Sequence, residues 1–179
     1  MKVVGERISI LKKENLLSIV ILPGLDKKKL FLIFTWLLAW SVCGVVVFMN
    51  YFATNNKDLK LFILVYLSFW AYFEFSIARS FIWKKWGKEK IWIQNGIFHY
   101  QREINKKGKI REWNIALMSK IEMVELKSTR LADTLSQSFW MKGGERLEFS
   151  SQGKIQRLAM QLTDEEAAII KKELNQFIE

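Results

Sequence analysis

Cysteine, histidine and proline are almost missing from this 179-residue chain, which has one of each. A single cysteine excludes an intramolecular disulfide framework, and one cysteine with one histidine argues against a structural zinc site. Apolar residues are not scarce: they make up 50% of the chain, which excludes a wholly disordered protein. The length favours either one domain or a membrane anchor joined to one small domain.

Motifs that carry catalysis are also missing. The sequence contains no phosphate-binding Walker loop, no Gly-x-Gly-x-x-Gly and no spacing typical of metal ligands. The only histidine, His99, falls on a predicted strand, and the only cysteine, Cys43, falls inside a predicted membrane span. We therefore expect a protein that is not an enzyme, with no cofactor, no metal and no small-molecule substrate.

Charge is missing from residues 30–52, and in a second apolar stretch, residues 61–83, only Glu74 and Arg79 carry it. A bilayer core about 30 Å thick needs about 20 helical residues, so each stretch is long enough to cross it. The short polar turn at residues 54–60 joins the two into a hairpin. The alternative is a pair of buried helices in a soluble bundle, but such helices normally carry a polar face.

Basic residues flank these spans, whereas the turn between them has only Lys57 and Lys60, beside Asp58. The positive-inside rule therefore predicts that both termini are cytoplasmic. The chain has a net charge of +10, and its clearest basic clusters, residues 27–29 and 84–90, lie beside the spans, which favours lipid over nucleic acid as the partner. The residues expected at lipid headgroups and the membrane interface are Lys27, Lys28, Lys29, Lys84, Lys85, Trp83 and Trp86.

The two ionisable residues of the second span are candidates for an intramembrane polar contact. Glu74 lies about 14 Å from the inner end of its helix, where a carboxylate is costly. It is expected to be protonated, to reach a polar group on another helix, or to face a partner subunit. Arg79 is near enough to the end for its charged head to reach the interface. The antiparallel first span brings Ala39, Trp40 and Cys43 to the depth of Glu74.

From residue 87 onward, short alternating runs separated by turn residues predict antiparallel strands. Asn95-Gly96 is a strong hairpin signal. Residues 7–22 predict one or two further strands, and residues 127–138 predict a loop suited to binding. The strands are expected at residues 91–93, 97–103, 109–115, 119–126, 146–149 and 154–160.

The chain ends in a predicted helix over residues 163–178. Thr163 and Glu166 have the spacing of a capping box, in which each side chain bonds a backbone N–H at the helix start. Ala167, Ile170 and Leu174 recur at helical spacing and form one apolar face. We expect this face to cover the open end of the sheet rather than to bind a partner.

The segments Trp86-Gly87-Lys88-Glu89, Ile91-Trp92-Ile93 and Asn95-Gly96, with the ending residues 161–167, resemble the bacterial pleckstrin-homology-like (PH-like) domain. With the preceding helix pair, the chain resembles small two-span bacterial membrane proteins that carry such a domain. Its layout is similar to that of the photosystem I assembly factor Ycf-four. The resemblance implies an α+β protein of the bacterial inner membrane, and it transfers no functional residue.

The resulting prediction has three parts: a strand segment at residues 1–26, a transmembrane hairpin at 27–86 and a cytoplasmic PH-like domain at 87–179. The expected role is a scaffold, assembly factor or accessory subunit of a membrane complex. The alternatives are a sensor of anionic lipid and a homo-oligomeric channel or transporter built around Glu74. Whether the first strands pair within the chain or with a neighbouring copy is left open. A possible partner surface comprises Lys106, Lys107, Lys109, Arg111 and Arg130.

Overall fold

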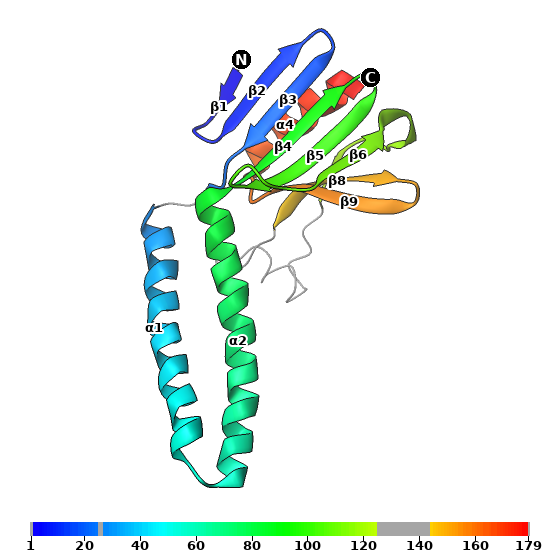
Figure 1. Cartoon of the computed structure of the whole chain (residues 1–179). Helices are drawn as coiled ribbons and strands as arrows, with labels where there is room; N and C mark the ends of the chain where they lie inside the picture. Colours follow the sequence, from blue (N-terminus) through cyan, green and yellow to red (C-terminus); the bar gives the residue numbers. More distant parts are fainter. Residues whose placement is uncertain (1, 25–26, 125–143, 179) are drawn as a thin grey trace. The chain divides into compact units, whose positions relative to one another are not determined.

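The computed structural model describes residues 2–24, 27–124 and 144–178, and it is an α+β protein with antiparallel sheets (Figure 1). The described residues form two compact units. One, the sheet unit, contains residues 2–24, 83–124 and 144–178. The other, the helical unit, contains residues 27–82. The predicted loop at 127–138 and its Arg130 lie outside the described residues.

The helical unit is formed by α1 (Lys27–Ala53) and by α2 (Lys57–Trp86), whose last turn belongs to the sheet unit. Both helices are long and apolar enough to cross a membrane. The connection is shorter than the predicted turn, because Asn56 starts α2 early. Its side-chain oxygen accepts hydrogen bonds from the N–H groups of Asp58 and Leu59, at 2.9 and 3.3 Å. This is an N-cap, which satisfies donors that the first helical turn leaves without partners.

The larger sheet has six strands in sequence order. Its third and fourth strands are joined only by the whole helical hairpin, yet they are antiparallel neighbours, with Ile19 opposite Ile91. The N-terminal strands therefore pair within the chain, and residues 2–24 belong to the same unit as the later strands. The strands are β1 (Lys2–Val4), β2 (Ile8–Lys13), β3 (Leu16–Ile21), β4 (Gly87–Gln94), β5 (Ile97–Ile104) and β6 (Ile110–Asn114).

A second sheet consists of β7 (Glu122–Met123), β8 (Glu145–Ser151) and β9 (Lys154–Met160). The predicted strand at 119–126 is thus only two residues long within the described part of the chain. Before it, β6 ends at Asn114, which caps a 3₁₀ turn, Ile115–Leu117. Its side chain accepts the N–H of Ala116 at 3.0 Å.

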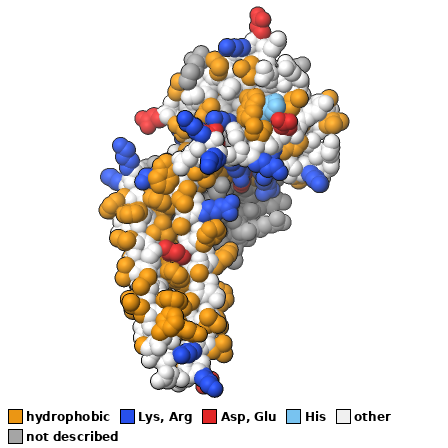
Figure 2. Space-filling view, viewed as in Figure 1, with side chains coloured by type: hydrophobic (Ala, Val, Ile, Leu, Met, Phe, Trp, Pro, Cys, Tyr) orange, Lys and Arg blue, Asp and Glu red, His pale blue; other side chains and the backbone are white. Residues whose placement is uncertain are grey.

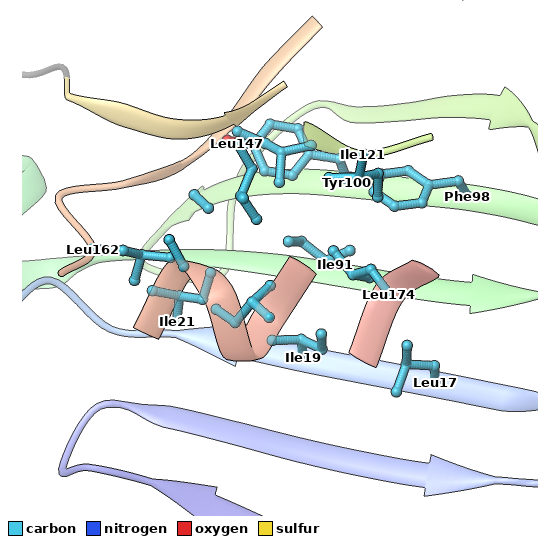
Figure 3. Close-up of a cluster of buried hydrophobic side chains, with 14 of the residues drawn as sticks. Leu17, Ile19, Ile21, Ile91, Phe98, Tyr100, Ile121, Leu147, Leu162 and Leu174 are labelled. Carbon is cyan, nitrogen blue, oxygen red and sulfur yellow. The ribbon is translucent and has the colours of Figure 1, made fainter. Parts of the chain in front are cut away.

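The C-terminal helix α4 (Asp164–Ile178) covers one face of the large sheet. Thr163 and Glu166 form the predicted capping box, with bonds of 2.9 and 3.2 Å. Alternate residues of β2 to β5 point toward the helix because side chains alternate across a strand, as Leu17, Ile19 and Ile21 do in Figure 3. Together with Ile170 and Leu174 of α4 they form one buried core.

Candidate functional site

A pocket of about 500 Å³ in the sheet unit gathers several of the predicted basic residues. It lies where the chain leaves β3 and where α2 joins β4, so the two connections to the helical unit both contribute to its wall. Its nine lining residues are Leu22, Pro23, Lys84, Lys85, Trp86, Gly87, Lys88, Asn105 and Lys106. We call this the lysine pocket.

None of the described residues that line the lysine pocket is acidic. The nearby carboxylate of Glu103 is buried on the sheet, where Lys88 Nζ lies 3.1 Å from one oxygen and Lys90 contacts the other. Hydrogen bonding from Lys90, and then from Lys88, lowers the pKa of Glu103, so this acid is ionised at neutral pH. It offsets one positive charge and holds Lys88 on the sheet.

Lys84 and Trp83 are inside the sheet unit rather than at an exposed interface, which differs from their predicted placement. The reason is local: β4 begins at Gly87, directly after the helix, so the last turn of α2 packs against its own sheet. A side chain at Gly87 would collide with the Trp83 ring. Lys84 donates a 3.1 Å hydrogen bond to the side-chain oxygen of Gln161. The neighbouring Trp86 is 44% exposed.

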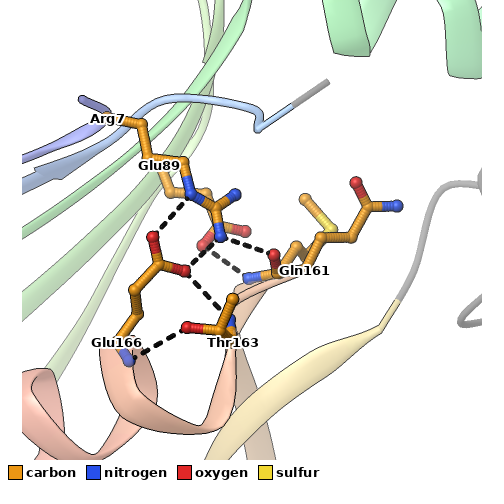
Figure 4. A network of polar contacts seen from close by, with 6 residues as sticks. Arg7, Glu89, Gln161, Thr163 and Glu166 are labelled. Atoms are coloured by element: carbon orange, nitrogen blue, oxygen red, sulfur yellow. Dashed lines mark hydrogen bonds and ion pairs between the residues drawn. The ribbon is translucent and has the colours of Figure 1, made fainter. Parts of the chain in front are cut away.

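Gln161 is held by a polar network at the start of α4 (Figure 4). Arg7 donates to the Gln161 carbonyl at 2.8 Å and forms an ion pair with Glu166. Hydrogen bonding from Arg7 lowers the pKa of Glu166. Next to this network, the carboxylate of Glu89 accepts the Met160 N–H at 3.1 Å. Sequence reasoning did not identify Gln161, because its partners are far from it in the chain.

The turn between β5 and β6 carries Lys106 to the pocket. Asn105 and Lys106 have φ values of 48° and 65°, in the left-handed region that is uncommon for lysine. Gly108 then passes so close to the backbone of Arg102 that a side chain there would collide with it. The Gln101 side chain donates to the Gly108 carbonyl at 2.8 Å. The backbone of this turn therefore sets the position of Lys106.

The other predicted basic residues do not line the lysine pocket. Lys107, Lys109 and Arg111 are exposed on the same turn and on β6. The residues Lys27, Lys28 and Lys29 are exposed at the start of α1, in the helical unit. The structure thus brings Lys84, Lys85, Trp86 and Lys106 together and separates the remainder of the predicted set.

Lys85 also contacts an aromatic surface. Its Nζ lies 4.5 Å from the centre of the Trp86 ring, a cation–π geometry. The pair places a positive charge beside an exposed indole, which is the combination typical of a membrane interface.

Inside the helical unit, Glu74 of α2 reaches a polar group on the other helix, one of the three predicted outcomes. The hydroxyl of Ser41 donates to its Oε1 at 2.5 Å. One turn away, the Trp70 indole donates to the Trp40 carbonyl at 3.1 Å. Gly44 is buried, and a side chain added there would collide with the Trp70 ring. Ser41 lies between Ala39 and Cys43, the residues predicted near the depth of Glu74; both of these are exposed.

Arg79 is exposed on α2 and, within the described residues, forms no ion pair with Glu74. The five-residue spacing separates the two side chains around the helix, because neighbours on one face are three or four residues apart. Glu74 and Arg79 are therefore two independent groups, as their spacing in the sequence predicts.

The described residues include no cluster of three or more histidine, cysteine, aspartate or glutamate side chains suited to a metal ion. His99 is partly buried and stacks on Trp92, with ring centres 4.9 Å apart and an angle of 6° between the planes. Its Nδ1 lies 3.3 Å from a Glu112 oxygen. His99 and Glu112 do not line the lysine pocket, whose described lining includes no serine, threonine, cysteine or histidine. The described geometry at the pocket is suited to binding an anion.

Comparison with known proteins gives no relative: no family model matches the sequence, and no curated protein or solved structure is significantly similar.

Proposed function

We propose that this chain is an integral membrane protein that acts, without catalysis, as a scaffold, assembly factor or accessory subunit of a membrane complex. The observation that carries the proposal is the exposure of the two long helices. Only 11% of the most apolar window of each helix is buried, whereas the core helix of a soluble protein is mostly buried. Apolar side chains cover the visible face of these helices (Figure 2). A hydrocarbon environment removes the cost of that exposure.

The proposed location is the bacterial cytoplasmic membrane, with both termini in the cytoplasm. The lysines at the start of α1 and the end of α2 support this orientation, because the connection between the helices has fewer basic residues. The sheet unit is then cytoplasmic.

The sheet unit is proposed to be a PH-like binding module. Antiparallel strands followed by one amphipathic C-terminal helix over the sheet support this assignment. A binding role is favoured because the pocket described above has charge but no nucleophile–base pair. Fold likeness alone does not establish function, so the proposal needs a direct test.

The test is the composition of the complex extracted from native cells in mild detergent, measured by blue-native electrophoresis and mass spectrometry. A different protein at fixed ratio to this chain is the expected result and would identify the complex. A pure homo-oligomer would overturn the accessory role and favour a self-assembled channel. A monomer in several mild detergents would also contradict the proposal.

A further inference from the structure

We propose that the lysine pocket binds the phosphate of one anionic glycerophospholipid, with the acyl chains remaining in the bilayer. This inference rests on the proposed membrane anchoring. Ile82 ends the apolar part of α2, and Lys85 follows it by three residues, or about 4.5 Å along the helix axis. If the bilayer core ends at Ile82, the chain itself brings Lys84, Lys85 and Trp86, which line the pocket, to headgroup depth.

Charge selects an anion. Four lysines line the pocket and no described lining residue is acidic. The ion pair with Glu103 offsets part of the charge of Lys88, and Lys84 is held by the neutral Gln161 side chain. A net positive site remains, and a phosphate with its several acceptor oxygens can receive hydrogen bonds from more than one ammonium group.

The apolar part of the wall selects a lipid over a free phosphate. Leu22, Pro23 and Trp86 line the same pocket, and Leu22 and Trp86 are both more than 40% exposed. Such a wall suits the glycerol and the first methylene groups of a lipid, but offers nothing to a small inorganic anion. The volume of about 500 Å³ is within the range of roughly 300–1,000 Å³ that small-ligand pockets have. It accommodates a headgroup rather than a whole lipid.

The turn residue Lys106 gives the sharpest test, because its neighbour Lys107 is a matched control. Both are exposed lysines on one turn, but only Lys106 lines the pocket. Replacing either with glutamine removes one charge from the same hairpin. A diffuse attraction to anionic membranes is weakened equally by both changes, whereas a phosphate site is weakened only by Lys106→Gln.

The experiment uses the full chain in neutral detergent, titrated with phosphatidylglycerol or with zwitterionic phosphatidylcholine and read by native mass spectrometry. We expect one tightly retained phosphatidylglycerol per chain. Lys106→Gln should weaken its binding about fivefold, since a basic residue near a lipid surface contributes about 1 kcal/mol, whereas Lys107→Gln should change it less than about twofold. Equal retention of both lipids, or equal weakening by both variants, would overturn the site.

Two controls separate the possible failures. Inorganic phosphate is added at the same concentration as the lipid, and loss of the bound lipid would overturn the lipid assignment in favour of a soluble phosphate. Membrane fractions are also extracted with alkaline carbonate. Release of the chain would refute the membrane anchoring itself, whereas a retained chain without preference for phosphatidylglycerol would refute the pocket alone.

Discussion

Most large apolar side chains of the sheet unit are buried, whereas most of those on the two long helices are exposed. Ile170 and Leu174 of α4 are fully buried, whereas Phe31 of α1 and Phe69 of α2 are 70% and 65% exposed. Ile33 of α1 is fully buried, but only 11% of the most apolar window of each helix is buried. This difference supports the proposed placement of the two long helices in hydrocarbon, whereas the sheet unit buries its apolar side chains in its own core.

The largest expected difference between the units is in the cost of removing apolar atoms. Leu174→Ala should lower the free energy of unfolding of the sheet unit by about 2–5 kcal/mol, because it leaves a cavity in a packed core. Leu38→Ala, at a 59% exposed position on α1, should change stability by less than about 0.5 kcal/mol. Denaturant unfolding of the full chain in detergent measures both. Equal losses of unfolding free energy in the two variants would contradict the claim that the sheet unit and the helices place their apolar side chains differently.

Charge pairing stabilises the sheet unit in a pH-dependent way. Glu166→Gln should cost about 1.5–3 kcal/mol at pH 7, because the variant loses the charged partner of Arg7 while keeping an acceptor for Thr163. The pKa of Glu166 is lowered in the folded chain. The stability that its charge contributes is therefore fully present above the unfolded glutamate pKa of about 4.3, and it is lost as pH falls through the pKa of the folded chain.

The measurement is the stability difference between wild type and Glu166→Gln from pH 7 to pH 3. Glu165→Gln is the control, since Glu165 lies exposed in the same helical turn. A difference that stays constant with pH would show that Glu166 acts through packing rather than charge.

Packing within the helical unit includes the Trp70 side chain of α2 against Gly44 of α1. Gly44→Ala should weaken it by about 1–3 kcal/mol, because the new methyl group collides with the Trp70 ring. Cys43→Ala, at an exposed neighbouring position, should have little effect. Thermal loss of the helical circular dichroism signal in detergent measures the change. Similar melting of both variants would mean that the helices do not pack at Gly44.

The smallest expected effect is at the polar contact between the helices. Glu74→Leu removes the bond to Ser41 and should cost about 0.6 kcal/mol, the average for hydrogen bonds between membrane helices. Glu74→Gln keeps an acceptor and should be neutral if the acid is normally protonated. The yield of the intact complex on a blue-native gel is the measurement. Loss with glutamine would instead show that a charge is needed.

Local signals predicted the parts of the fold that are local in the chain. Residues close together in the sequence determine three of these features: the capping box at Thr163, the hairpin at Asn95-Gly96 and the two long helices. The strand at 154–160 was also placed correctly, because it alternates between two turns. The pairing of β3 with β4 was not predictable, since it joins residues about 70 positions apart across the helical hairpin.

The candidate site shows the same division. Sequence reasoning found Lys84, Lys85 and Trp86 because they follow an apolar run, and it found Lys106 because it lies in a basic turn. It did not bring them together, because their proximity depends on β4 pairing with β5 and on the left-handed turn after β5. Nor did it expect Lys84 to be buried, since Gln161 approaches it only in the folded chain.

The most direct test of the two surroundings uses the single cysteine. Cys43 is exposed on α1, so it faces hydrocarbon if the helix spans a membrane and water if it does not. Membrane vesicles are opened so that both faces of the bilayer are accessible, and they are treated with a water-soluble maleimide that does not enter the bilayer. Vesicles with the native chain are compared with vesicles that contain a Cys43→Ser, Lys154→Cys chain, whose thiol lies on the exposed start of β9. We predict that the cysteine at 154 is labelled to completion while Cys43 stays unlabelled until the bilayer is dissolved in denaturing detergent. Labelling of Cys43 before the bilayer is dissolved, at the rate seen for position 154, would contradict the membrane-spanning hairpin.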